Sequence, residues 1–305
     1  MPSVRRLPIL FLFLAVLPLN GCLFRSHAVK PVVTPASLKT ATQQQLIDYI
    51  NTQAAKIQSM QATVDIDTTV GGAKKGKVTE YQQIRGYVLA RKPAMLRMIG
   101  LMPIVRNRAF DMVSDGQNFE LWVPAKNRFV IGRNDQVTNN PQQPLENLRP
   151  QAIYDALLIR EIDPIHDIAV RENHSDTVTD SKGHKVLNAD YIIEVILKGT
   201  EGWFLGRKIV FSRTDLLPSR QLLYNESGEL VTDARYEDYK EYDGIQFPSR
   251  IEISRPQEEY DITLSFVKLE LNLPLPDDKF ELEKPADAVV IHLDEPKQPP
   301  RVQHK

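Results

Sequence analysis

The feature that most restricts the fold of this chain is a change of hydrophobic period after Met60. Before this residue, apolar side chains recur at three- and four-residue steps, whereas residues 62–67 alternate strictly between apolar and polar side chains. Strict alternation places the apolar side chains on one face of a β-strand. Residues 71–76, rich in glycine and lysine, then turn the chain into a second extended segment at 78–90. The chain after Met60 is therefore predicted to begin as an antiparallel hairpin.

The same pattern continues as far as residue 271, broken by turn residues such as Asp115-Gly116 and Asp243-Gly244. Further extended segments are predicted at 95–101, 108–114, 119–123, 128–132, 190–197, 203–212, 219–225, 230–242, 245–253 and 259–271. The pattern does not alternate strands with helices as βαβ units do. We therefore predict a mainly β fold with a single curled antiparallel sheet of about eleven strands, since so large a sheet must curl or leave one face bare.

Two helices are expected beside this sheet. After Thr40, the apolar residues Leu46, Ile50, Ala54 and Ile57 lie on one face of an amino-terminal amphipathic helix. This face either packs on the core or closes a cavity, and the sequence does not separate the two.

A second, shorter helix is predicted after a polar stretch at 134–149, which we interpret as a mobile loop. Pro150 suits the first turn of a helix, because its missing N–H has no partner there. The apolar stripe consists of Ile153, Tyr154, Leu157 and Leu158. We interpret this helix as a lid on the sheet, with a plain crossover helix as the alternative.

The first 22 residues have the layout of a secretory signal. Arg5 and Arg6 precede an apolar run at 7–19, and Gly21 directly precedes Cys22, the only cysteine of the 305 residues. The apolar run is shorter than the roughly 20 residues that a membrane-spanning helix needs. Residues 1–21 are therefore predicted to be a signal peptide. The position of Cys22 directly after this segment allows lipidation of its thiol. An ordinary secretion signal and a buried cysteine in an amino-terminal helix are the alternatives.

Methionines gather in the early strands. Met95, Met98, Met102 and Met112 lie close in the sequence to Phe110. Flexible thioether side chains suit a cavity with changing guests, but they also fill gaps in an ordinary core. Both interpretations stay open.

The turn at 100–104 is apolar where a turn between strands is normally polar. Leu101 and Met102 lie between Gly100 and Pro103, and Ile104 follows. These side chains are predicted either to be exposed for binding or to tuck beneath the lid helix.

The sequence gives no sign of catalysis. It has no nucleophile elbow, His-Glu-x-x-His pair, phosphate-binding glycine loop or Cys-x-x-Cys pair, so we predict no enzyme activity and no cofactor. A net charge of −1 argues against nucleic acid as a partner. Imidazole and carboxylate groups at His166, Asp167, His174, Asp176, Asp180 and His184 have metal-ligating chemistry. Their spacing matches no ligand pattern, and residues 171–185 are predicted to be a charged loop, so no metal site is predicted.

Two stretches resemble known families. Leu19-Asn20-Gly21-Cys22 resembles the lipobox of bacterial lipoproteins, which implies acylation of Cys22. In Gram-negative lipoproteins, an Asp directly after this cysteine resembles a signal for retention in the inner membrane. This chain has Leu23 there, which implies export to the outer membrane of a Gram-negative host.

The order of elements resembles the LolA/LolB-like superfamily of periplasmic lipoprotein carriers and lipid-binding lipoproteins. The residues that carry this resemblance are 100–103, 115–116, 121–124, 236–239, 244–248 and 272–280. It implies an unclosed β-barrel with a helical lid at 40–284.

The remaining segments follow from these boundaries. Residues 22–39 are expected to be a lipidated tether, and the proline- and charge-rich residues 285–305 a disordered tail.

The resemblance implies a lipid- or lipoprotein-binding protein that faces the periplasm and holds acyl chains in an apolar cavity. Its expected partners are the membrane, through acylated Cys22, the acyl chains of lipoprotein or lipid, and a periplasmic carrier protein. Leu101 and Met102 are by resemblance the loop residues that hand cargo to the membrane, while Met95, Met98, Met112 and Phe110 are candidate cavity residues. The alternative is a structural or sensory envelope lipoprotein, whose sheet is filled by its own side chains and which binds a protein partner.

Overall fold

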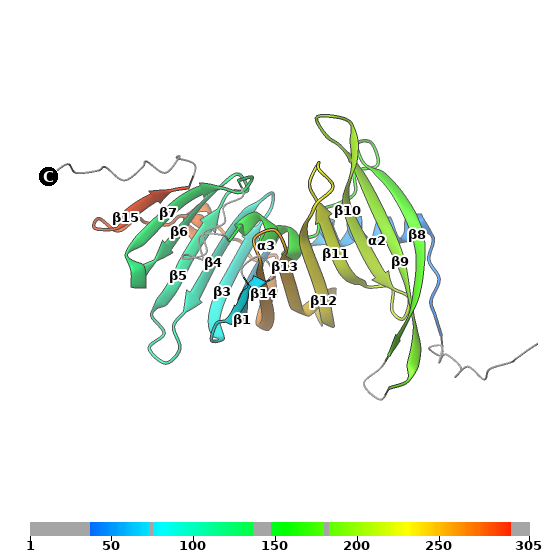
Figure 1. Ribbon diagram of the computed structural model, residues 1–305, viewed down its shortest axis with the longest axis horizontal. Coiled ribbons are helices and arrows are strands. Elements are labelled where there is room, and N and C mark those ends of the chain that lie inside the picture. The colour runs from blue at the N-terminus through cyan, green and yellow to red at the C-terminus, as the bar shows by residue number, and fades with distance from the viewer. Residues whose placement is uncertain (1–36, 73–75, 137–147, 180–182, 294–305) are drawn as a thin grey trace, which may run out of the picture. The chain divides into compact units, whose positions relative to one another are not determined.

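The computed structural model describes residues 37–72, 76–136, 148–179 and 183–293 (Figure 1). The predicted signal peptide, Cys22 and the tether up to residue 36 lie outside these ranges. The chain divides into two compact units, and the larger consists of Ala36–Ser175 with Ala189–Lys305. Of the smaller unit, Met1–Pro35 with Asp176–Asn188, the described residues 176–179 and 183–188 include the ends of two strands.

One large, curled and unclosed sheet forms the body of the protein (Figure 1). Its strands are β1 (Ser59–Gly72), β2 (Lys77–Glu80), β3 (Ile84–Arg91), β4 (Met95–Leu101), β5 (Arg108–Ser114), β6 (Asn118–Val123), β7 (Arg128–Arg133), β8 (Ile168–Thr179), β9 (Lys185–Lys198), β10 (Trp203–Ser212), β11 (Pro218–Tyr224), β12 (Leu230–Tyr242), β13 (Ile245–Arg255), β14 (Tyr260–Leu271) and β15 (Val289–His292). The spatial order is β15-β7-β6-β5-β4-β3-β1-β14-β13-β12-β11-β10-β9-β8, with β2 paired to β1. Most neighbours in this order are also neighbours in the sequence, as expected for an antiparallel meander.

β1 and β14 are the neighbouring strands of the sheet that lie farthest apart in the sequence. Met60 lies opposite Leu271 and Ile66 opposite Leu264, so the first and the last long strands meet at its centre. The alternation predicted for residues 62–67 is confirmed, because Ala62, Val64 and Ile66 are buried. This pairing brings the two halves of the meander into one sheet.

The described residues form fifteen strands rather than about eleven, for three reasons. The extended segment predicted at 78–90 is two strands, β2 and β3, because the chain leaves the ladder between Glu80 and Ile84. The predicted charged loop at 171–185 is wrong for its first part, which belongs to β8. This strand ends the sheet, and from Glu172 onward it is exposed on both faces, so burial imposes no alternation on that part of its sequence.

The predicted disordered tail is also wrong in part. Val289–His292 forms β15, which pairs with β7 in the parallel sense, an exception to the expected antiparallel pattern. Backbone hydrogen bonds extend this pairing, since Val289 N–H donates to Asn127 O at 2.9 Å and Leu293 N–H to Ile131 O at 2.9 Å. The segment is rich in β-branched residues, and Ile291 and Leu293 pack against the core, but the proline and charge content of the surrounding tail obscured this signal. Residues 294–305 lie outside the described ranges.

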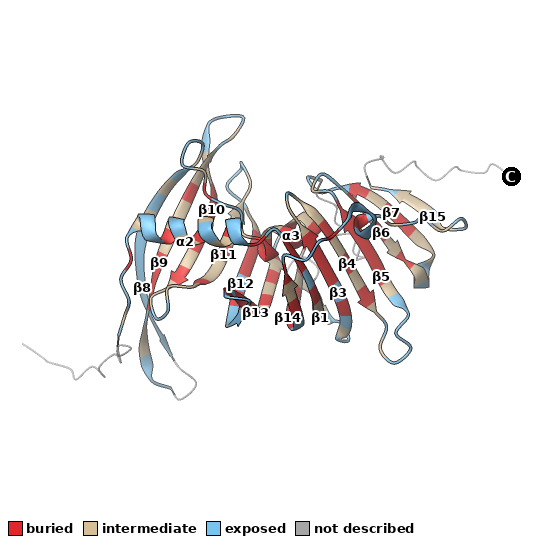
Figure 2. Cartoon of the chain, turned by 180° about the vertical axis from the view of Figure 1, so that it is seen from behind, coloured by how far each residue is buried: buried red, intermediate tan, exposed pale blue. Residues whose placement is uncertain are grey.

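The amino-terminal helix α2 (Gln43–Lys56) begins with a capping box. Gln45 N–H donates to the Thr42 hydroxyl at 3.2 Å, and Thr42 N–H donates to the Gln45 side-chain oxygen at 2.8 Å. Leu46, Ile50 and Ala54 are buried, which confirms the predicted apolar face. The opposite face is exposed to solvent, as the pale side of α2 in Figure 2 shows.

The short helix α3 (Pro150–Leu157) has Pro150 in its first turn, as predicted, and its apolar stripe is buried. Arg149, predicted to belong to a mobile loop, is 2% exposed, and its guanidinium lies over the Phe119 ring. Residues 137–147 of that predicted loop lie outside the described ranges. Two single turns of 3-10 helix, η2 (Pro124–Lys126) and η4 (Asp277–Phe280), complete the described secondary structure.

Both α-helices cover the same face of the sheet, here called the inner face. Cross-strand pairing places Ile209, Gln221, Ala234 and Ile253 in one row on this face. Most of the buried hydrophobic side chains form two large clusters. The buried positions are coloured along the strands and helices in Figure 2. The α2 cluster joins α2 to β9 and β10 and includes Leu46, Ile50, Ile193, Val195, Ile209 and Phe211. The α3 cluster joins α3 to β1, β3–β7 and β12–β14 and includes Met98, Met112, Ile153, Leu157, Ile251 and Leu264.

Candidate functional site

A small apolar cavity lies where the two clusters meet. It is bounded by α2 on one side, by α3 and the residues after it on another, and by β12 and β13 beneath. The lining side chains include Ile50, Ala54, Ile57, Ala156, Leu157, Leu158, Tyr236, Tyr239, Phe247 and Pro248. Of the predicted lid residues, Leu157 and Leu158 therefore border the cavity, while Ile153 packs in the α3 cluster.

The cavity measures about 50 Å³. A single water needs roughly 10–15 Å³ measured in this way, whereas ligand pockets for drug-sized molecules enclose roughly 300–1,000 Å³. The cavity is thus too small for a long acyl chain, which fits only if α2 or the segment around α3 moves away from the sheet.

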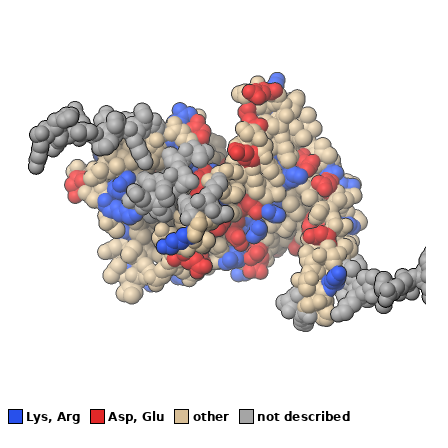
Figure 3. Space-filling model, viewed as in Figure 1, with Lys and Arg blue, Asp and Glu red and all other residues tan. Residues whose placement is uncertain are grey.

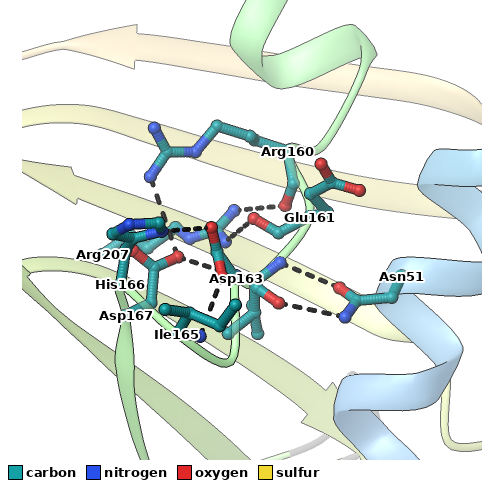
Figure 4. A network of polar contacts seen from close by, with 9 residues as sticks. Asn51, Arg160, Glu161, Asp163, Ile165, His166, Asp167 and Arg207 are labelled. Atoms are coloured by element: carbon teal, nitrogen blue, oxygen red, sulfur yellow. Dashed lines mark hydrogen bonds and ion pairs between the residues drawn. The ribbon is translucent and has the colours of Figure 1, made fainter.

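The segment after α3 is fastened from both sides (Figure 4). From the sheet, the buried Arg207 of β10 donates to the carbonyls of Arg160 at 2.6 Å and Glu161 at 2.8 Å. From α2, the Asn51 amide bonds both backbone groups of Ile162, donating to its oxygen at 3.0 Å and accepting from its N–H at 2.8 Å. Opening the cavity on this side therefore breaks a small number of defined polar contacts.

Further contacts hold the ends of α2. Gln43 donates to Ala169 O at 2.9 Å and accepts from Arg171 N–H at 3.1 Å, so its side chain pairs with the backbone of β8. At the other end, the Lys92 ammonium donates to Ala54 O, and Asn272 donates to Lys56 O at 2.8 Å. Burial lowers the pKa of Lys92.

A buried polar row crosses the inner face between the two clusters. Arg207, Thr232 and Arg255 are 3%, 1% and 9% exposed, and Arg255 donates to Thr232 at 2.9 Å. Arg255 also forms an ion pair with the buried Glu258 at 2.6 Å. Sequence analysis missed this row, because polar residues in an amphipathic strand are ordinarily assigned to the solvent face.

Asp155 of α3 lies above this row. Gln151 donates to its carboxylate at 2.7 Å, and Gln221 donates to its backbone oxygen at 3.0 Å. Burial raises the pKa of Asp155 to about 6, against the lowering effects of the Gln151 hydrogen bond and of the Arg160, Arg207 and Arg255 charges. Asp155 is thus a titratable group within α3, which the apolar stripe of the sequence did not indicate.

The predicted methionine group is divided by the fold. Met98 and Met112, with Phe110, are buried in the α3 cluster on β4 and β5. Met95 instead packs against Leu89, Leu275 and Phe280 in a small separate cluster. None of these side chains lines the cavity between the helices.

Met102 lies apart from this group, in the loop that joins β4 to β5. This loop at 102–107, the apolar loop, exposes its side chains to solvent. Met102, Ile104 and Val105 are 43%, 98% and 64% exposed, while Leu101 ends β4 and is half-buried. Hydrogen bonds from Met102 N–H to Asn107 O at 2.7 Å and from Arg106 N–H to Met102 O at 3.0 Å close the loop. Sequence analysis chose Leu101 and Met102, but the most exposed apolar residue is Ile104.

The backbone of the apolar loop is unusual. Ile104 and Arg106 have φ values of +68° and +55°, in the left-handed region that β-branched residues rarely adopt. Such a conformation costs roughly 1–3 kcal/mol and persists only where the surroundings enforce it. The left-handed backbone conformation thus accompanies a side chain that is almost fully exposed and packs against neither cluster.

Cationic side chains lie beside the apolar loop. A shallow pocket of about 250 Å³ next to it is lined by Arg85, Tyr87, Met102, Ile104 and Arg106. Arg85 pairs with Asp65 at 2.9 Å, whereas Arg106 makes no ion pair with another described residue. Over the face seen in Figure 3, acidic and basic side chains are interspersed, so no large surface of one sign stands out there.

The histidines and aspartates considered as metal ligands do not form a ligand group among the described residues. His166 pairs with Asp163 at 2.6 Å, which raises the pKa of His166 and lowers that of Asp163 (Figure 4). Asp167 lies 4.0 Å from Arg160, and His174 lies in β8. Asp180 is outside the described ranges. Within the residues that the structure describes, no three His, Cys, Asp or Glu side chains are arranged to hold a metal ion.

In the described part of the chain, no helix has both the length and the apolar character needed to cross a bilayer.

Comparisons with known proteins identify relatives only at a distance. A family model described as "Uncharacterized protein" matches residues 165–284, and no curated protein matches the chain. Among solved structures, a LolA superfamily protein from Nitrosomonas europaea is similar at 16% identity and a TM-score of 0.45, over 80% of this chain and 99% of the other. A putative outer membrane lipoprotein-sorting protein domain from Vibrio parahaemolyticus is similar at 13% identity and a TM-score of 0.46, over 77% and 95%.

A DUF1329 family protein from Desulfovibrio piger is similar at 15% identity and a TM-score of 0.47, over 77% of this chain and 94% of the other. All three structures are less than 25% identical to this chain, and their TM-scores are below 0.5. The chain itself forms one large unclosed curled sheet covered by two helices.

Proposed function

We propose that this protein is a lipid-anchored carrier that binds acyl chains of lipoprotein or lipid between α2, α3 and the inner face of the sheet. The observation that carries the proposal is the apolar cavity at the junction of the two clusters, bounded by two separate helices. The junction between the two clusters is easier to widen than the interior of either cluster. When the two helices separate there, each helix keeps the contacts within its own cluster. The process is binding and release, without chemistry.

The apolar loop fits the same function. Ile104, with almost all of its side chain exposed, is not part of either cluster. Exposed apolar side chains next to a cation suit the surface of a bilayer, where the apolar groups enter the acyl region and the cation meets phosphate groups. We propose that Met102, Ile104 and Val105 touch the membrane during transfer, with Arg106 beside them.

In this proposal acylated Cys22 anchors the chain in the outer membrane, and residues 22–39 tether the body on the periplasmic side. A periplasmic carrier protein is the expected donor of cargo. The second candidate, a structural or sensory envelope lipoprotein, is favoured by the small volume of the cavity, which the protein's own side chains nearly fill.

Native mass spectrometry separates the two functions. The mature chain with Cys22→Ser, which prevents acylation, is purified without detergent and its bound lipids are extracted. Stoichiometric acylated cargo supports the carrier. A protein that is empty and takes up no fluorescent fatty acid contradicts the carrier and supports the scaffold.

Transfer to vesicles tests the apolar loop. Ile104→Asp and Leu101→Asp are compared with Val78→Asp, an exposed valine on β2. A charge in the loop should slow transfer by about tenfold or more, because a carboxylate enters the bilayer at a cost of roughly 2 kcal/mol or more. Equal transfer by all three variants would remove the loop from the mechanism.

A further inference from the structure

The cavity between the helices is apolar except for a few side chains, and two of these stand out. Tyr236 of β12 is 5% exposed, and its hydroxyl has no hydrogen-bond partner among the described residues. Gln53 of α2 also lines the cavity, and its side-chain oxygen is buried without a partner within the same described ranges. One group comes from the sheet and the other from the covering helix.

Such groups are costly to keep. A buried polar atom without a partner loses its hydration and gains nothing in return, at a cost of roughly 1–3 kcal/mol. Tyr239 lines the same cavity and avoids this cost, because its hydroxyl donates to Pro218 O at 2.8 Å. Burial also raises the pKa of Tyr236, so its hydroxyl keeps its proton and remains a donor at physiological pH.

The chemistry of the two atoms defines what they can bind. The Tyr236 hydroxyl can donate to a carbonyl oxygen, and the Gln53 oxygen can accept from an N–H group. An amide offers both partners at once, an ester offers only the carbonyl, and a hydrocarbon offers neither. We propose that the cavity selects acyl chains that are joined through an amide, an inference that rests on the proposed carrier function. Tyr236 donates to the amide oxygen, and Gln53 accepts from the amide N–H.

This assignment places the polar end of the ligand at the junction of the two clusters. The acyl chain then extends along the apolar inner face once the helices separate. The selectivity resides in Tyr236 and Gln53, while the apolar walls supply the affinity for the chain.

The test uses three probes with the same chain: N-methyl dodecanamide, methyl dodecanoate and dodecane. Each displaces a fluorescent fatty acid from the mature chain carrying Cys22→Ser. The wild type should bind the amide more tightly than the ester, and the ester more tightly than the alkane, by about threefold to tenfold for each hydrogen bond. Tyr236→Phe should make the ester equal to the alkane and leave the amide only the advantage of its single hydrogen bond to Gln53. Gln53→Leu should make the amide equal to the ester.

Thermal unfolding of the empty protein gives a second readout. Tyr236→Phe should leave the Tm unchanged or raise it, because it removes a buried group without a partner. The matched control is Tyr260→Phe: the Tyr260 hydroxyl accepts from Arg149 N–H at 3.2 Å outside the cavity, so its loss should lower the Tm and leave the probe order unchanged.

The outcomes are distinct. Equal binding of the three probes, or a probe order unaffected by Tyr236→Phe, overturns the amide assignment and leaves the carrier function standing. Failure of all three probes and of the fluorescent fatty acid overturns both. A clear drop in Tm for Tyr236→Phe with no change in selectivity would make the hydroxyl a structural group.

Discussion

The two helices that cover the inner face are held there by different forces. Helix α2 has 14 residues, a capping box and one buried face. Helix α3 has eight residues and no side-chain cap, and most of its residues are buried. Isolated helices shorter than roughly 12–15 residues are marginal in water. Helix α3 therefore exists because the sheet buries it, whereas the start of α2 is set by its own sequence.

The polar contacts of the two helices differ as well. Asparagine, glutamine and lysine side chains fasten α2 and the segment after α3 at their ends. Helix α3 instead places a carboxylate, Asp155, above the buried polar row. Helix α2 thus depends on capping and end contacts, while α3 depends on burial and on the protonation state of Asp155.

The largest effect is expected from the burial of α3. Ile153→Ala should lower the free energy of unfolding by about 2–5 kcal/mol, because Ile153 is fully buried and its removal leaves a cavity. Urea denaturation measures the change. Thr52→Ala, on the exposed face of α2, is the control and should stay within about 0.5 kcal/mol. Equal effects would contradict the dependence of α3 on burial.

Asp155→Asn should have a smaller effect that depends on pH. The pKa of Asp155 is about 6 in the folded protein, above its ordinary value, so the folded state binds more protons than the unfolded state between those two values. Wild-type stability therefore falls as pH rises from about 4 to about 6, and the penalty is fully present above that window.

The asparagine variant lacks this penalty. At pH 7.5 it should be more stable than wild type by about 1–3 kcal/mol, and at pH 4 the two should be nearly equal. Urea denaturation at the two pH values measures the difference. A constant difference at both pH values would show that Asp155 does not titrate within the folded protein.

The smallest effect is expected at the start of α2. Thr42→Ala removes the hydroxyl that accepts from Gln45 N–H and should cost about 1 kcal/mol. Calorimetry should show a fall in Tm of about 2–4 °C for a domain of this size. Thr42→Ser, which keeps the hydroxyl, should restore most of the loss. If Thr42→Ala has no effect, the capping box adds nothing to α2 beyond its buried face.

Much of the fold followed from hydrophobic periodicity. The strands with one buried face, such as β1 with Ala62, Val64 and Ile66, were predicted because burial imposes a period of two. The edge strand β8 was missed for the opposite reason, because most of it is exposed and its backbone pairing places little demand on the side chains. The β-branched residues of β15 were missed because they lie within a proline- and charge-rich tail.

The candidate site was predictable only in part. The sequence indicated an apolar turn and two covering helices, but it could not show that Ile104 is the most exposed residue of that turn, because backbone conformation decides its direction. Arg207, Tyr236 and Gln221 were missed because each sits in a strand whose polar positions are ordinarily outward. Their burial depends on which helix covers that row.

Side-chain period and local backbone chemistry were enough to predict the β-rich class, the apolar face of α2 and the start of α3 at Pro150. The division of most of the core into two clusters, with a cavity at their junction, could be seen only in the folded chain. The same holds for the positions of Tyr236 and Gln53, which both line that cavity. These features arise from the pairing of β1 with β14 and from the curl of the sheet, which bring together residues far apart in the chain.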